Sequence, residues 1–167
     1  QKERITRFVN SQSNQQSSEN YNSFQSQIAV GSGQLYGKGL GQGSQSHLRF
    51  LPERQTDFIF ASFAEEWGFV GSFILVILYF ILSLFLLYRS MMSKNKFEYY
   101  FLIMTVTAIT FQVFVNIGMN IGILPITGVT LPFISYGGSS LLSLSLMMGI
   151  SQNIISKQKK KITMDIK

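Results

Sequence analysis

Three long apolar segments alternate with polar stretches along this chain. Residues 68–88, 99–124 and 133–155 contain no Asp, Glu, Lys or Arg. The hydrocarbon core of a bilayer is about 30 Å thick and takes roughly 20 residues of helix to cross, so each segment is long enough to span it. The pattern predicts an all-α polytopic membrane protein with three transmembrane helices, preceded by a large extracytoplasmic loop, residues 1–67.

The charges beside the apolar segments predict this orientation. Short cytoplasmic loops are enriched in Lys and Arg. The loop 89–98 carries three basic residues and the tail 156–167 is lysine-rich, so both are predicted to be cytoplasmic. The uncharged turn 125–132 and residues 1–67 are then predicted to lie outside. The basic residues of 1–67 do not oppose this, because the rule applies to loops shorter than about 60 residues.

The first polar segment divides by composition. Residues 1–10 place three apolar side chains at helical spacing beside basic ones, which predicts a helix on the membrane surface. Residues 11–27 are rich in Ser, Gln and Asn, which predicts a linker. Residues 31–43 hold six glycines around Lys38. Such a stretch suits either a loop that wraps a substrate or a flexible turn.

Composition excludes several kinds of site. The 167 residues are 46% hydrophobic and 13% charged, and the basic residues behind the net charge of +6 flank apolar segments, so no nucleic-acid partner is predicted. The chain has no cysteine and a single histidine, His47. A protein-built zinc site needs three or four ligands, so no metal site is predicted and His47 is interpreted as a loop residue.

Polar residues recur inside the second and third apolar segments. Gln112, Asn116 and Asn120 are spaced by four, which places their amides on one helical face. That face should meet other helices, through hydrogen bonds or as a substrate contact, and hydrogen bonding is the commoner case. Ser135, Ser139 and Ser143 repeat at the same interval and are interpreted as a packing surface. Proline and glycine between 125 and 138 predict a structured turn.

Two motifs carry a resemblance to a known family. LPERQTDFIF at 51–60 and GVTLPFISYGGSS at 128–140 resemble the SEDS family of membrane glycosyltransferases, which polymerise bacterial peptidoglycan. The similarity covers about residues 25–157. It implies the C-terminal fragment of a ten-helix fold: the fourth extracytoplasmic loop and helices eight to ten. NIGMN at 116–120, followed by LPITG, resembles the branch that acts in cell elongation.

The resemblance implies a role for Asp57, which matches the essential acid of the family. In the implied reaction two lipid II molecules are joined with inversion, and Asp57 acts as the general base. The alternative from the residues alone is that Thr56 or Asp57 caps the following helix. Glu65 and Glu66 could be cation or interface ligands, but they are interpreted as solvated acids near the start of that helix. Gln55 departs from the family, which usually has histidine there.

The remaining expectations concern ligands and partners. Lys38, Arg49 and Arg54 are candidates to neutralise the pyrophosphate of the donor, and a divalent cation there stays open. Gln112, Asn116 and Asn120 are candidates for substrate contact. The resemblance also implies a class B penicillin-binding protein and membrane proteins of the elongation machinery as partners, in the bacterial cytoplasmic membrane. A lipid-linked precursor transporter and a non-catalytic scaffold for a transpeptidase are the alternatives.

Overall fold

The computed structural model describes residues 18–43 and 56–165, and all regular structure within them is α-helical. This confirms the all-α prediction. The helices are α2 (Ser18–Ser32), α4 (Ile59–Met91), α5 (Lys96–Asn120) and α6 (Gly138–Asp165). Some residues with expected roles lie outside the described part of the chain: residues 1–10, His47, Arg49 and Arg54.

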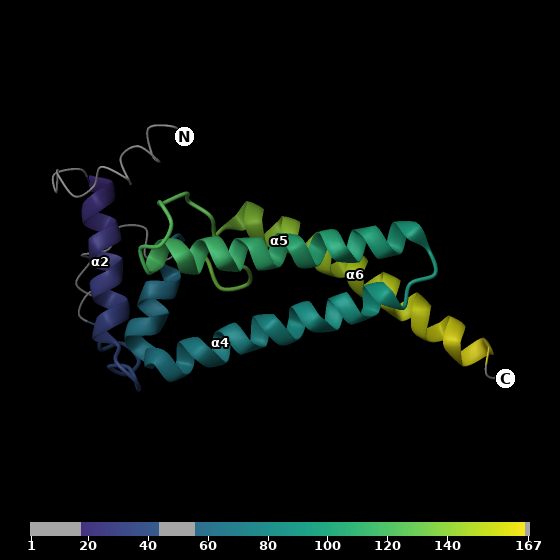
Figure 1. Ribbon diagram of the computed structural model, residues 1–167, viewed down its shortest axis with the longest axis horizontal. Helices are drawn as coiled ribbons and strands as arrows, with labels where there is room; N and C mark the ends of the chain where they lie inside the picture. Colours follow the sequence, from purple (N-terminus) through teal and green to yellow (C-terminus); the bar gives the residue numbers. More distant parts are fainter. Residues whose placement is uncertain (1–17, 44–55, 166–167) are drawn as a thin grey trace.

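Helices α4 and α5 form an antiparallel hairpin, and α2 lies across its open end (Figure 1). The short loop between them ends at a helix cap, because the side chain of Asn95 accepts a hydrogen bond from the main-chain N–H of Phe97 at 3.1 Å. Side chains from both helices and from α6 form the main core: Tyr79, Leu86, Leu102, Ile109, Val113, Ile154 and Ile155. The hairpin therefore provides the frame on which the other segments are held.

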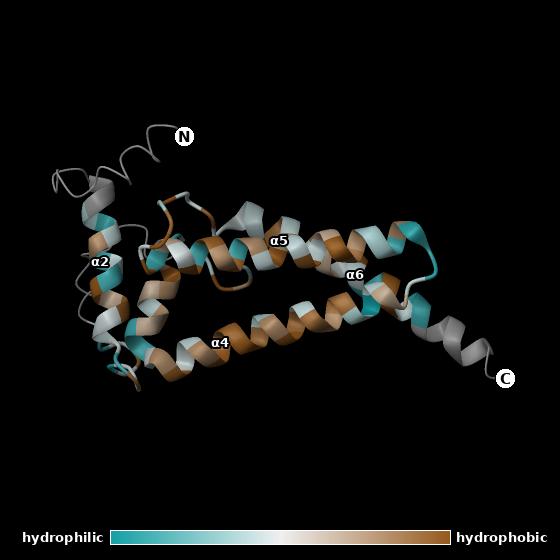
Figure 2. Ribbon diagram, viewed as in Figure 1, coloured by the Kyte–Doolittle hydropathy of each residue, from teal (hydrophilic) through white to brown (hydrophobic). Residues whose placement is uncertain are grey.

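Helices α4 and α5 are long and apolar enough to cross a membrane, by length and composition. Large apolar side chains of α4, such as Phe73 and Phe80, are exposed along its length, and the hydrophilic residues gather at the α4–α5 loop and around α2 (Figure 2). This distribution suits a lipid environment. Helix α6 begins at Gly138, so residues 133–137 of the third predicted span precede the helix.

The segment between α5 and α6, residues 121–137, is a structured, non-helical connection. The prolines and glycines predicted such a turn, but at 125–132, so the connection is longer than expected at both ends. Phe133 has a φ of 66°, which is unusual for a residue with a side chain. The hydroxyl of Tyr79 in α4 donates a hydrogen bond to the carbonyl of Pro132. Ser135 lies in this connection, so its expected place beside Ser139 and Ser143 on one helix face was wrong.

Helix α2 corrects the prediction that 11–27 is a linker, because residues 18–27 are helical. The hydroxyl of Ser26 donates to the main-chain carbonyl of Asn120 at 3.1 Å, and Ala29 is fully buried. These contacts with the rest of the fold outweigh the weak helix propensity of a Ser- and Asn-rich sequence. Composition alone therefore could not identify this helix.

Helix α4 bends at Gly68, whose φ of 69° and ψ of −165° are not helical. Residues 34–39 close the bend with main-chain hydrogen bonds. The N–H groups of Lys38 and Gly39 donate to Glu65 and Glu66 carbonyls, and those of Phe69 and Val70 donate to Gln34 and Leu35 carbonyls, at 2.8–3.1 Å. Helix ends leave such groups unpaired, so the loop supplies their partners. This part of the glycine-rich stretch is thus packed against α4, and a substrate contact from it stays a prediction.

Candidate functional site

Asp57 lies in the turn that leads into α4. The N-cap of the helix is Phe58, which is 3% exposed and makes no side-chain capping bond. Neither Thr56 nor Asp57 occupies the N-cap position, so the capping alternative has no support from the helix boundary. Both residues are half-buried.

Three buried side chains hold the main chain of this turn. Asn116 and Asn120 of α5 each donate a side-chain N–H to the carbonyl of Asp57, both at 3.1 Å. Ser135 donates its hydroxyl to the carbonyl of Thr56 at 2.7 Å. We call Asn116, Asn120 and Ser135 the carbonyl clamp. Carbonyls that precede a helix have no helical partner, and the clamp satisfies them.

The clamp also binds the connection that follows α5. Asn116 donates a second N–H to the carbonyl of Val129 at 2.7 Å. The hydroxyl of Ser135 accepts from the N–H of Leu131, also at 2.7 Å. Both asparagines are fully buried, and Ser135 is 7% exposed. Asn116 and Asn120 do lie on one face of α5, as their spacing predicted. Their amides form hydrogen bonds that join α5 to the turn before α4 and to the connection after α5.

The carboxylate of Asp57 lies beside the connection as well. A Cβ added to Gly128 would be 3.6 Å from Oδ2 of Asp57, and Gly128 has a φ of 71°. Gly128 is the first residue of the motif 128–140, which is far from Asp57 in the sequence. The two motifs, 51–60 and 128–140, therefore meet at one site through residues 56–57, 128 and 135.

Lys38 and Glu65 form an ion pair at 3.0 Å, away from the clamp. Glu65 is fully buried and its carboxylate also accepts from the hydroxyl of Ser32 at 3.4 Å. The interpretation of Glu65 as a solvated acid was wrong, because the loop 34–39 covers this turn of α4. Lys38 is partly exposed, and its expected contact with a pyrophosphate stays a prediction.

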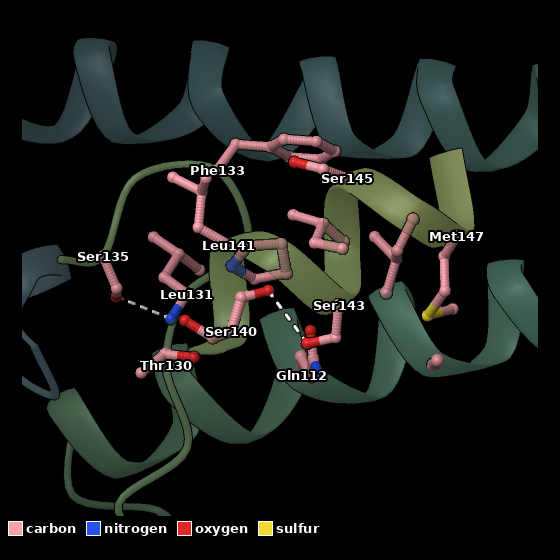
Figure 3. Close-up of a pocket in the computed structure, with 14 residues that line it drawn as sticks. Gln112, Thr130, Leu131, Phe133, Ser135, Ser140, Leu141, Ser143, Ser145 and Met147 are labelled. Carbon is pink, nitrogen blue, oxygen red and sulfur yellow. Dashed lines mark hydrogen bonds between the residues drawn. The ribbon is translucent and has the colours of Figure 1, made fainter. Parts of the chain in front are cut away.

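Gln112 does not join the clamp. It lines a separate cavity of about 250 Å³ between α5, residues 130–135 and α6 (Figure 3). Its lining is neutral and rich in hydroxyl groups: Thr130, Ser135, Ser140, Ser143 and Ser145. Ser135 belongs to both the cavity and the clamp. A contact between Gln112 and a substrate remains a prediction.

Sequence reasoning missed the hydrogen bond between Ser135 and Thr56. The motif 128–140 could have indicated this bond. Its prolines and glycines were instead assigned to a turn, and Ser135 was assigned to a helix face. In the part of the chain that the structure describes, no three or more His, Cys, Asp or Glu residues are grouped to hold a metal ion. A divalent cation at the pyrophosphate therefore remains a prediction.

The fold and the site define a polytopic α-helical membrane protein in which the main chain around an aspartate is held just before an apolar helix. The FtsW/RodA/SpoVE family model, described as cell cycle protein, matches residues 1–160. The chain belongs to this family, which is the family that the two motifs indicated.

Individual relatives agree. The chain is 48% identical over 139 residues to the peptidoglycan glycosyltransferase MrdB of Escherichia coli K12, covering 83% of this chain and 38% of the relative. It is 46% identical over 136 residues to the peptidoglycan glycosyltransferase RodA of Treponema pallidum, covering 80% of this chain and 31% of that protein. The chain thus spans less than two fifths of the length of these relatives.

A solved structure is similar in fold. "Structural coordination of polymerization and crosslinking by a peptidoglycan synthase complex" matches with a TM-score of 0.72 and 30% identity. The match covers 95% of this chain and 42% of that one. The arrangement of the described helices is therefore that of a part of a larger membrane fold.

Proposed function

We propose that this chain is part of a peptidoglycan glycosyltransferase of the bacterial cytoplasmic membrane, which polymerises glycan strands from lipid II. The relatives with this activity are 46–48% identical over most of the chain. The observation that carries the proposal is the placement of Asp57, because its main chain is held by three buried donors, two from α5 and one from the connection between α5 and α6. Such support suits a group that must keep a defined position.

In the proposed reaction, the 4-hydroxyl of an acceptor N-acetylglucosamine attacks C1 of a donor N-acetylmuramic acid. The bond from C1 to the undecaprenyl pyrophosphate breaks, the configuration inverts, and Asp57 takes the hydroxyl proton. Pyrophosphate is a good leaving group and needs charge neutralisation more than protonation. Lys38, Arg49 and Arg54 are the proposed cations, and Lys38 would share its charge between Glu65 and the substrate.

We further propose a role in cell elongation and cell shape. It rests on the resemblance of residues 116–128 to the elongation branch and on the relatives named MrdB and RodA. A class B penicillin-binding protein is the proposed partner, supported by the similar structure of a peptidoglycan synthase complex. Elongation-machinery membrane proteins are proposed as further partners.

The test is polymerisation of lipid II by the purified full-length protein that carries this segment. Products are resolved on a gel that separates glycan strands by length. The proposal expects strands that grow with time and disappear on muramidase treatment. A transporter or a scaffold would leave lipid II unpolymerised, and that result would overturn the proposed activity.

A further inference from the structure

The carbonyl clamp acts on the two peptide groups that flank the Cα of Asp57. The carbonyl of Thr56 belongs to the peptide plane before this Cα, and the carbonyl of Asp57 belongs to the plane after it. Each plane is rigid, so only φ and ψ of residue 57 relate them. Hydrogen bonds to both carbonyls therefore fix φ and ψ at Asp57, and with them the direction in which its Cβ leaves the main chain.

The donors come from two different segments. Asn116 and Asn120 lie one turn apart on α5, whereas Ser135 lies in the connection to α6. Asn116 and Ser135 also bond to residues 129 and 131, so the two segments are tied to each other as well as to the turn. Because both asparagines are fully buried, water cannot replace a bond that they lose without a change in packing.

The clamp uses the main chain of Asp57 and not its carboxylate. A group that abstracts a proton must stay within about 3 Å of the atom that loses it. A misplacement of about 1 Å can reduce a rate about a hundredfold. A device that sets the direction of the side chain through the main chain meets this need.

We propose that Asn116, Asn120 and Ser135 are positioning residues for Asp57, which act on the chemical step and do not bind substrate. The inference rests on the proposed function, in which Asp57 is the base. It replaces, for Asn116 and Asn120, the expectation of direct substrate contact.

The test uses Ser135→Ala and Asn116→Asp in the full-length protein. Asn116→Asp keeps the size of the side chain but removes its donors to the carbonyls of Asp57 and Val129. We expect kcat to fall about tenfold to a hundredfold with an unchanged KM for lipid II. Ser135→Thr keeps the hydroxyl and should restore much of the rate. If Asn116→Asp does not accumulate in the membrane, the two Ser135 variants decide.

Two control variants remove equally buried hydroxyls without touching the clamp. Ser151→Ala removes a bond to the carbonyl of Met147 at 2.8 Å, and Thr105→Val removes one to Phe101 at 2.9 Å. Both are expected to keep normal kcat and KM. Melting temperatures of all variants, measured in detergent, separate a loss of folded protein from a loss of rate.

A double-mutant cycle connects the clamp to Asp57. In the Asp57→Asn background, Ser135→Ala should cause no further loss of rate, because the group that it positions is already inactive. Normal kcat for Ser135→Ala, a raised KM with normal kcat, or a further loss in the Asp57→Asn background would each overturn the inference. Absence of polymerisation by the unmodified protein would instead overturn the proposed function.

Discussion

The two ends of the first part of α4, residues 59–67, are held by different means. At the beginning, side chains of Asn116, Asn120 and Ser135 bind main-chain carbonyls. At the bend, main-chain groups of residues 34–39 bind main-chain groups of residues 65–70. Side-chain donors can be removed one at a time without breaking the chain path, whereas the bend depends on close contact between two backbones. The beginning of α4 is therefore suited to adjusting the position of Asp57, and the bend at Gly68 is suited to fixing the shape of the helix.

The bend gives the largest expected effect. A Cβ on Gly37 would lie 2.1 Å from the carbonyl oxygen of Glu66, and Gly37 has a φ of 79°. Gly37→Ala must displace two backbones, so we expect a loss of about 4 kcal/mol or more and little folded protein. Fluorescence-detected size exclusion of the membrane extract measures the folded fraction.

Two other glycines are matched controls for Gly37. Gly39 has a φ of 96°, but the nearest atom to an added Cβ is 3.8 Å away, so Gly39→Ala should cost only about 1–2 kcal/mol for the backbone conformation. Gly31, in α2, has no atom within 4 Å of an added Cβ, so Gly31→Ala should be neutral or slightly stabilising. Equal losses for Gly37→Ala and Gly39→Ala would show that the close contact is not what fixes the bend.

The ion pair at the bend gives an intermediate effect. Lys38→Met removes the cation that lies 3.0 Å from the fully buried carboxylate of Glu65. Removing one partner of a buried pair costs about 3–5 kcal/mol, and the partial exposure of Lys38 should bring the loss to about 2 kcal/mol. Thermal unfolding in detergent measures it. Adding Glu65→Gln should recover most of the loss, and a double variant no more stable than Lys38→Met would contradict the pairing.

The smallest effect is expected from cysteines that only report sidedness. Lys94→Cys and Thr127→Cys, each in a cysteine-free background, change exposed positions and should leave stability and activity unchanged. In whole cells an impermeant thiol reagent should label position 127 and not position 94, because short basic loops face the cytoplasm. Labelling at position 94 without permeabilisation would show that the orientation of α4 is the reverse of the predicted one.

The sequence could predict those features that depend on long apolar runs and regular spacing. Both α4 and α5 were expected from uncharged segments, and the amides of Asn116 and Asn120 do share a face. Helix α2 was missed, because its stability comes from contacts such as that of Ser26 with Asn120 and not from its own composition. The burial of Glu65 was missed for the same reason, since the covering loop is distant in sequence.

The site was predictable only in part. Asp57 was proposed as a candidate from its motif, and the amide face was predicted from its spacing. The bond from Ser135 to Thr56 joins residues far apart in the chain, and no local pattern specifies such a contact. It also requires residues 133–137 to be non-helical, whereas their apolar character favoured a continuous span. Phe133 and Gly128 have positive φ angles, which are incompatible with a continuous right-handed helix through this segment.

Asp57→Asn in the full-length protein shows whether Asp57 is the base. This substitution keeps the size of the side chain and leaves the clamped carbonyls in place. General-base catalysis contributes about 10² to 10⁴ in rate, so polymerisation of lipid II should fall at least about a hundredfold while folded protein reaches the membrane at its normal level. Near-normal glycan synthesis by the Asp57→Asn protein would show that Asp57 is not the base.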